Sequence, residues 1–305
     1  MPRTAIIALL SLILLPAAAQ AEHFEQTIDI PYHEAKGETL YLDTFVPNDE
    51  PPLDAYAPGT GGQGLGIIDV VSGGWSGARG RLDEHKQAQL FQIFTARGYT
   101  VFAIRPGSLP DFTALEMVEN IERGIRWVKA NAEEYGVDPD RLGIVGASAG
   151  GHLASLVTLN PKPAQPGAED PLLRHSTNVA AAAVFFPPTD FLDWEGRVAD
   201  FGSRPGLLFT EGLDGKSEDE IHAALAAISP ARQVQPGAPP FMIVHGDADP
   251  VVPLQQSEVF VEALRAAGNE VTLDIEPGGG HLWLTIPFNI IEVAGWFDEV
   301  LPAAE

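Results

Sequence analysis

The chain is long, acidic and free of cysteine. It has 305 residues, with 18 Lys+Arg against 42 Asp+Glu, a net charge of -24 and no Cys. Because binding to phosphate backbones needs clustered cations, this charge argues against a nucleic-acid partner and disfavours anionic membrane surfaces. The absence of Cys excludes a thiol nucleophile and a Cys-ligated zinc site.

The first residues have the pattern of a secretory signal peptide. Arg3 precedes an apolar run, Ala5–Leu15, and Ala19-Gln20-Ala21 is a small-x-small cleavage motif. The run is shorter than the roughly 20 apolar residues that span a membrane. We therefore expect residues 1–21 to be a signal peptide and the protein to be secreted or periplasmic, with no membrane span in the mature chain.

The elements predicted along residues 22–305 form an α/β pattern. Two segments that alternate apolar and polar residues come first, at Phe24–Ile30 and Thr39–Val46, and are typical of an antiparallel pair. From there strands alternate with helices, which is typical of a parallel sheet between helical layers. The predicted strands are 65–72, 100–105, 141–147, 179–186, 241–245 and 271–276, and the predicted helices are 82–97, 113–135, 149–159, 254–267 and 287–301.

This pattern predicts one α/β domain over residues 22–305, with an eight-stranded, mostly parallel sheet flanked by helices. An excursion rich in Pro, Gly and Asp interrupts the alternation at about 187–236. No GxGxxG follows the first parallel strand, which argues against a dinucleotide-binding fold.

The sharpest motif is Gly146-Ala147-Ser148-Ala149-Gly150, which lies between a predicted strand and a predicted helix. This G-x-S-x-G needs small neighbours because the turn from strand to helix is very tight. The turn exposes the Ser148 hydroxyl at a helix N-terminus, where free N–H groups and the helix dipole favour a developing negative charge. Ser148 is therefore the predicted nucleophile.

A serine nucleophile needs a base, and the chain has eight His residues. His281 follows the last predicted strand in a Gly-rich loop at the carboxyl edge of the sheet, where open α/β sheets carry their sites. His152 is expected to be packed in the helix after Ser148, and His85 is expected on a surface helix. His281 is therefore the predicted base.

The carboxylate that orients this base should lie between Ser148 and His281 in the chain. Asp247 and Asp249 both follow the predicted strand at 241–245, and either can reach the edge of the sheet that carries His281. The other would be a turn residue or a helix cap.

The oxyanion hole should follow the first parallel strand, where the sequence has Gly73-Gly74. Without side chains, these two glycines allow backbone N–H groups to approach a substrate oxygen closely.

Five segments together resemble the α/β-hydrolase superfamily, in particular secreted carboxylesterases grouped with hormone-sensitive-lipase-like and feruloyl/acetyl-xylan esterases. They are VVSGGW at 70–75, AIRPGSLPDF at 103–112, DPDRLGIVGASAGGHLA at 138–154, PPFMIVHGDADPVVP at 239–253 and GGGHLW at 278–283. The resemblance covers the chain from about residue 65 to its end, except for the excursion.

The resemblance implies a triad of Ser148, Asp249 and His281 and an oxyanion hole made by the amides of Gly73, Gly74 and Ala149. In one respect the chain departs from the family, which usually has His-Gly-Gly-Gly-Trp where this sequence has Val-Ser-Gly-Gly-Trp at 71–75. That His usually braces the loop, so the hole is expected to be intact but differently supported. The excursion is where such enzymes build a lid or acyl pocket; its candidate residues are Phe191, Trp194, Phe201, Leu207, Leu208 and Phe209.

The expected reaction is cleavage of a carboxylic ester by a serine hydrolase through an acyl-enzyme intermediate. The expected substrate is a small-molecule or carbohydrate ester, and neither a metal nor an organic cofactor is expected. Two alternatives stay open: a serine peptidase of the prolyl-oligopeptidase type, and a binding protein that kept the fold and lost turnover. The acyl group, the alcohol and the oligomeric state do not follow from the sequence.

Overall fold

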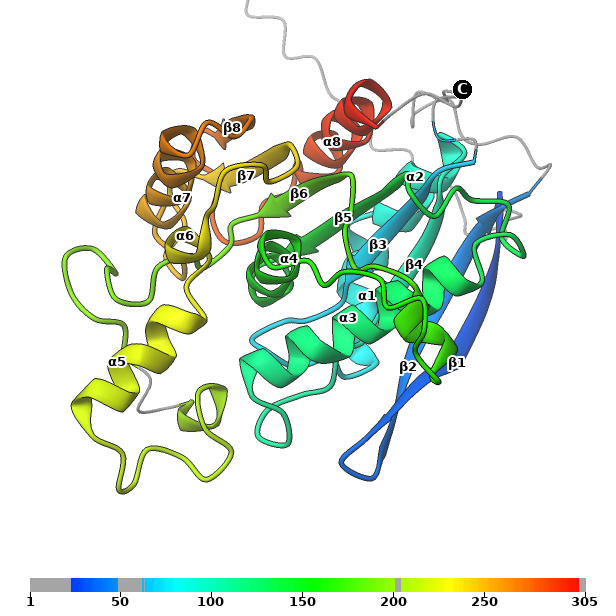
Figure 1. Cartoon of the computed structure of the whole chain (residues 1–305). Helices are drawn as coiled ribbons and strands as arrows, with labels where there is room; N and C mark the ends of the chain where they lie inside the picture. The colour runs from blue at the N-terminus through cyan, green and yellow to red at the C-terminus, as the bar shows by residue number, and fades with distance from the viewer. Residues whose placement is uncertain (1–22, 49–61, 63, 201–203, 302–305) are drawn as a thin grey trace, which may run out of the picture.

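Eight strands form a single mixed sheet in the computed structural model, which describes residues 23–48, 62, 64–200 and 204–301 (Figure 1). The order is β1-β2-β4-β3-β5-β6-β7-β8; β2 runs antiparallel to both neighbours and every other pair is parallel. The strands are β1 (Phe24–Ala35), β2 (Glu38–Pro47), β3 (Gly66–Val70), β4 (Thr100–Ile104), β5 (Leu142–Ala147), β6 (Ala181–Phe185), β7 (Phe241–Gly246) and β8 (Val271–Glu276). The predicted sheet is confirmed.

Helices cover both faces of this sheet (Figure 1). One layer contains α3, α4, α6 and α7, and the opposite layer contains α1, α2 and α8. The helices are α1 (Gly80–Gln87), α2 (Leu90–Ala96), α3 (Ala114–Ala130), α4 (Ala149–Leu159), α5 (Glu218–Ala227), α6 (Pro230–Gln233), α7 (Gln255–Ala266) and α8 (Ile286–Val300). Among the described residues, no helix combines the length and the apolar character that crossing a membrane needs.

The central strands are apolar throughout because both of their faces are buried. In β3, Ile68 and Val70 join the core on the α3 and α4 side, while Ile67 belongs to the core on the α2 and α8 side. Asp69 is the exception in this strand: it is fully buried and, by alternation, faces the layer of α1 and α2. A buried carboxylate in such a strand needs a partner, which α1 supplies in the site described below.

The single helix predicted over 82–97 is wrong, because the chain forms two helices there. Gln89 separates α1 from α2 and adopts a left-handed conformation with φ 61. The break changes the direction of the chain so that Phe91 and Phe94 are fully buried in the core shared with α8, whereas α1 buries only Leu82. Burial of two phenylalanines outweighs the cost of one residue in the left-handed region.

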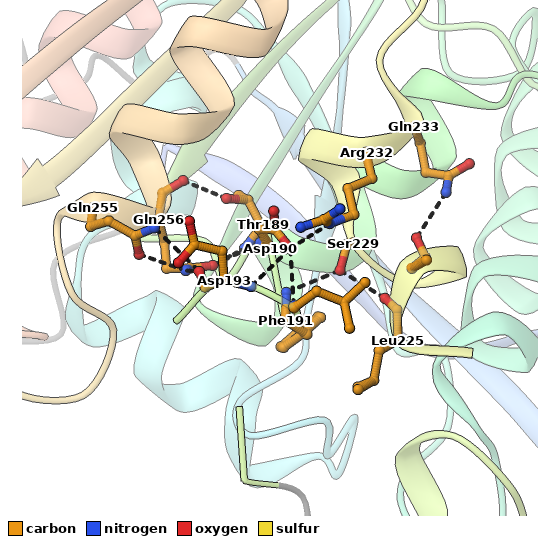
Figure 2. Close-up of polar contacts among 12 residues, drawn as sticks. Thr189, Asp190, Phe191, Asp193, Leu225, Ser229, Arg232, Gln233, Gln255 and Gln256 are labelled. Carbon is orange, nitrogen blue, oxygen red and sulfur yellow. Dashed lines mark hydrogen bonds and ion pairs between the residues drawn. The ribbon is translucent and has the colours of Figure 1, made fainter. Parts of the chain in front are cut away.

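The start of the excursion is fastened to α7 by a buried glutamine (Figure 2). The side-chain oxygen of Gln256 accepts from the amides of Thr189 and Asp190 at 2.9 and 2.7 Å, and its amide nitrogen donates to the carbonyl of Asp193 at 2.8 Å. Ser229, just before α6, accepts from the amide of Phe191 at 3.0 Å. These bonds hold the segment that carries Phe191 and Trp194 against the body of the domain.

The predicted signal peptide, residues 1–21, lies outside the described residues. Phe201, a candidate pocket residue of the excursion, also lies outside them.

Candidate active site

Ser148 occupies a tight turn between β5 and α4. Its φ of 51 and ψ of -120 place it in a strained region for a residue with a side chain. A β-carbon on Gly146 would meet the backbone of Gly150 at 2.5 Å, and one on Gly150 would collide with the carbonyl of Val70. The amide of Ser148 donates to the carbonyl of Phe185 at 2.9 Å. The motif therefore has glycines where backbones touch, and the turn projects Ser148 into the pocket.

Hydrogen bonds join Ser148 to His281 and His281 to Asp249. Nε2 of His281 lies 3.0 Å from Oγ of Ser148, and Nδ1 lies 2.8 Å from Oδ2 of Asp249. The structure thus brings together three side chains from the ends of β5, β7 and β8. With a proton on Nδ1 that is donated to the Asp249 carboxylate, Nε2 is free to accept the serine proton.

Asp249 is held as a carboxylate. Its side chain is fully buried, and its other oxygen accepts from the amides of Val251 and Val252 at 2.7 and 3.0 Å. Burial by itself raises the pKa of this carboxyl, but hydrogen bonds from His245, His281 and the two amides outweigh it and lower the pKa well below its ordinary value. Asp249 therefore stays ionised at any pH at which His281 can act as a base.

Asp247 lies in the turn after β7 and bonds to the neighbouring loop. It accepts from the amide of Gly278 at 2.6 Å, in the loop that carries His281, and it is exposed. The Asx hydrogen bond in this turn is made by Asp249, which accepts from the amide of Val251. Asp247 thus ties two loops together and does not touch the imidazole.

The loop of His281 packs directly on the end of β7. A β-carbon on Gly246 would collide with the carbonyl of Gly279, and the amide of Ala248 donates to that carbonyl at 2.9 Å. The ring of Phe186 lies 4.6 Å from the His281 ring, centroid to centroid. These contacts restrict the imidazole to a position between the serine and the carboxylate.

Two of the three predicted oxyanion donors are free. Within the described part of the chain, the amides of Gly74 and Ala149 have no acceptor. Gly73 differs from the prediction: its N–H donates to the carbonyl of Ser76 at 3.1 Å, because these two residues close a short antiparallel bridge. The amide of Trp75, which sequence reasoning did not single out, likewise has no acceptor among the described residues.

The oxyanion loop is supported by a buried histidine from α4. Nε1–H of Trp75 donates to Nδ1 of His152 at 3.0 Å, and Nε2–H of His152 donates to the carbonyl of Ile228 at 2.7 Å. Val71, at the position of the family's bracing His, is instead buried in the apolar core. His152 is packed, as expected, and it provides the different support that the loop was expected to need.

His152 should make the protein sensitive to acid. Burial lowers its pKa to about 4, although the hydrogen bond to Ile228 acts in the opposite direction. Between about pH 6.5, where an unfolded His titrates, and about pH 4, the unfolded chain binds one proton more than the native chain. As the pH is lowered through this window, the free energy of unfolding should therefore decrease, by up to about 3 kcal/mol.

Urea unfolding of His152→Gln at several pH values measures this contribution. At neutral pH the variant should be less stable by about 1–3 kcal/mol, because Trp75 and Ile228 lose a buried partner. Its stability should also depend less on pH than that of the wild type. His222→Gln, at an exposed position on α5, is the matched control. Equal pH slopes for His152→Gln and the wild type would contradict the assignment.

Ser148 and His281 line a cavity of about 660 Å³. Phe191 and Trp194 of the excursion line its wall, and their rings stack at 6.2 Å. The other described candidates of the excursion lie elsewhere: Leu207 and Leu208 pack in the core, and Phe209 lies under Lys216. Among the described residues of the excursion, those that line the pocket lie between positions 188 and 204.

Sequence reasoning placed His85 on a helix surface, and the structure corrects this. Nδ1 of His85 lies 2.7 Å from Oδ2 of the buried Asp69, and the His85 ring is only 11% exposed and lines the pocket. The signal was present in the sequence, because Asp69 interrupts an otherwise apolar strand. Asp69 in that strand indicated a buried charge, but the sequence did not identify His85 as its partner.

The sheet order, the elbow and the Ser–His–Asp series together define an α/β hydrolase. The family model of BD-FAE matches residues 53–264. The chain therefore belongs to the BD-FAE family.

Comparisons with individual proteins agree with this fold. The chain is 33% identical over 249 residues to esterase LipQ of Mycobacterium tuberculosis, covering 80% of this chain and 53% of LipQ. It is 26% identical to an acetylxylan esterase of Xylanibacter ruminicola, covering 72% of this chain and 41% of that protein. A solved carbohydrate esterase from gut microbiota superposes with a TM-score of 0.72 at 22% identity, covering 92% and 99% of the two chains. The chain spans about half the length of the curated relatives it matches.

Proposed function

We propose that the protein is a serine hydrolase that cleaves carboxylic esters through an acyl-enzyme intermediate. The observation that carries this proposal is the hydrogen-bonded series Asp249–His281–Ser148, with Ser148 and His281 lining the same pocket as Gly74, whose amide has no acceptor among the described residues. The printed names of relatives such as esterase LipQ and the acetylxylan esterase support an ester substrate. Small-molecule and carbohydrate esters are the proposed substrates.

In the first half of the reaction, Oγ of Ser148 attacks the ester carbonyl carbon while Nε2 of His281 takes the serine proton. The carbonyl oxygen becomes an oxyanion and accepts hydrogen bonds from the amides of Gly74 and Ala149. The tetrahedral intermediate then collapses, and Nε2–H of His281 protonates the departing alcohol. The acyl group remains on Ser148.

In the second half, water replaces the alcohol. Nε2 of His281 removes a proton from the water as it attacks the acyl carbon, and the same two amides hold the second oxyanion. When this intermediate collapses, the proton returns to Oγ of Ser148 and the acid leaves. Asp249 stabilises the imidazolium formed in both halves and does not itself take the proton.

A fluorophosphonate probe and an ester panel test the proposal on purified protein. We expect the probe to label Ser148, because only an activated serine reacts. We also expect turnover of para-nitrophenyl esters or of acetylated or feruloylated xylan fragments. Labelling without ester turnover, combined with cleavage of a prolyl para-nitroanilide, would favour the peptidase alternative. Absence of both labelling and turnover would favour a binding protein.

A further inference from the structure

The pocket beside Ser148 has a charge opposite to that of the rest of the protein. Over the whole chain, Asp and Glu outnumber Lys and Arg by 42 to 18. Among the residues that line the pocket the order is reversed, with Arg81, Arg197 and Arg204 against Glu84 and Asp200. The pocket wall therefore offers guanidinium groups to a ligand, although the protein as a whole is acidic.

Two of these arginines pack against the oxyanion loop itself. The Arg81 side chain covers Gly73, since a β-carbon there would lie 2.9 Å from its Cδ and 3.2 Å from its guanidinium carbon. An Nη nitrogen of Arg204 would lie 4.0 Å from a β-carbon on Gly74, and its guanidinium lies 5.3 Å from the centre of the Trp75 ring. The positive charges are thus next to the residues proposed to bind the reacting carbonyl.

The two arginines differ in their counter-charges. Arg81 pairs with Glu84 at 2.5 Å, one helical turn away on α1. Among the described residues, Arg204 has no carboxylate partner, and its one recorded side-chain interaction is with the face of Trp75. A guanidinium that stacks on an aromatic ring keeps its N–H donors free at the edge. Arg204 therefore offers an unused, forked set of donors to a ligand.

His85 adds a further donor to the same wall of the pocket. Its Nδ1 is bound to Asp69, and among the described residues its Nε2 has no hydrogen-bond partner. Burial lowers the pKa of His85, but the charge of Asp69, its hydrogen bond and the charge of Glu84 together outweigh burial, so that the pKa is raised above its ordinary value. In its protonated form, His85 would direct the Nε2–H donor to a bound anion.

We propose that the pocket takes esters that carry a carboxylate in their acid or alcohol part, and that Arg204 binds this carboxylate. Arginine suits the role because its fork can donate two parallel hydrogen bonds to one carboxylate. The apolar wall formed by Phe191 and Trp194 would accommodate the uncharged remainder of the substrate. The inference rests on the proposed esterase function and narrows its substrate class.

Two matched substrate pairs test this preference in the full chain. Para-acetoxybenzoate and para-acetoxybenzamide differ in the charge of the leaving group, and monomethyl and dimethyl adipate differ in the charge of the acid part. We expect the wild type to prefer the anionic member of at least one pair by about ten-fold in kcat/KM, and the preference to shrink as salt is added. Higher kcat/KM for the neutral member in both pairs would overturn the inference.

Arg204→Gln then assigns the preference to one residue. The variant should lose most of the anionic-to-neutral ratio, through a higher KM for the anionic ester. Arg265→Gln, which removes the same charge from an exposed position on α7 outside the pocket, should keep the wild-type ratio.

An alternative role for Arg204 predicts a different result. If its charge served only to stabilise the oxyanion, Arg204→Gln would lower kcat on both esters equally, and the unchanged ratio would overturn the inference. If the wild type cleaved no ester at all, the proposed function itself would fail. If the wild type cleaved neutral esters without preferring the anionic ones, the proposed ester hydrolysis would stand and the proposed carboxylate preference would be wrong.

Discussion

Ser148→Ala is expected to lower kcat for ester hydrolysis by at least about 10³-fold. The alanine lacks the oxygen that forms the acyl-enzyme, so that only the pocket and the oxyanion amides remain to help water attack. Steady-state rates with a para-nitrophenyl ester, together with loss of fluorophosphonate labelling, measure the effect. Turnover above about 1% of wild type would be incompatible with Ser148 as the nucleophile.

The variant must stay folded for this comparison to be meaningful. The strain at φ 51 is present with either residue, and among the described residues the lost hydroxyl hydrogen-bonds only to His281. We therefore expect the free energy of unfolding to change by less than about 0.5 kcal/mol. Ser176→Ala, which removes a hydroxyl outside the pocket, serves as the control for activity.

Asp249→Asn should lower kcat by up to about 10⁴-fold. The new amide oxygen can still accept from Val251 and Val252, which turns the amide nitrogen towards Nδ1 of His281. A donor at that place favours the tautomer with its proton on Nε2, which cannot accept the serine proton. The imidazolium also loses the charge that stabilises it, so the two effects reinforce each other.

Asp247→Asn is the matched control, with the same chemical change two residues away. Its amide oxygen can keep the bond to Gly278, and the side chain does not touch His281. We expect it to lower kcat by less than about ten-fold. Rates for the two variants on one substrate decide the assignment: if Asp247→Asn is the slower enzyme, the two roles must be exchanged.

The strand and helix pattern could be predicted because it depends on local properties of the chain. Strands buried on both faces must be apolar throughout, and helices must bury one stripe. Where the prediction was wrong, at 82–97, the cause is tertiary: the break at Gln89 serves to bury Phe91 and Phe94 against α8. The residues around Gln89 carry no local pattern that predicts the packing of Phe91 and Phe94 against α8.

The sequence by itself determined the elbow at Ser148, because the steric limits of a tight turn act between neighbouring residues. It also showed the chain order of the three predicted triad residues, because each follows a predicted strand. Only the tertiary structure decided that Ser76 occupies the amide of Gly73, that His152 supports Trp75 across 77 residues, and that Asp69 holds His85. The same holds for the position of Arg204 on Trp75. These are contacts between side chains and loops that meet only after the sheet has formed, and their energies depend on burial, which sequence periodicity does not specify residue by residue.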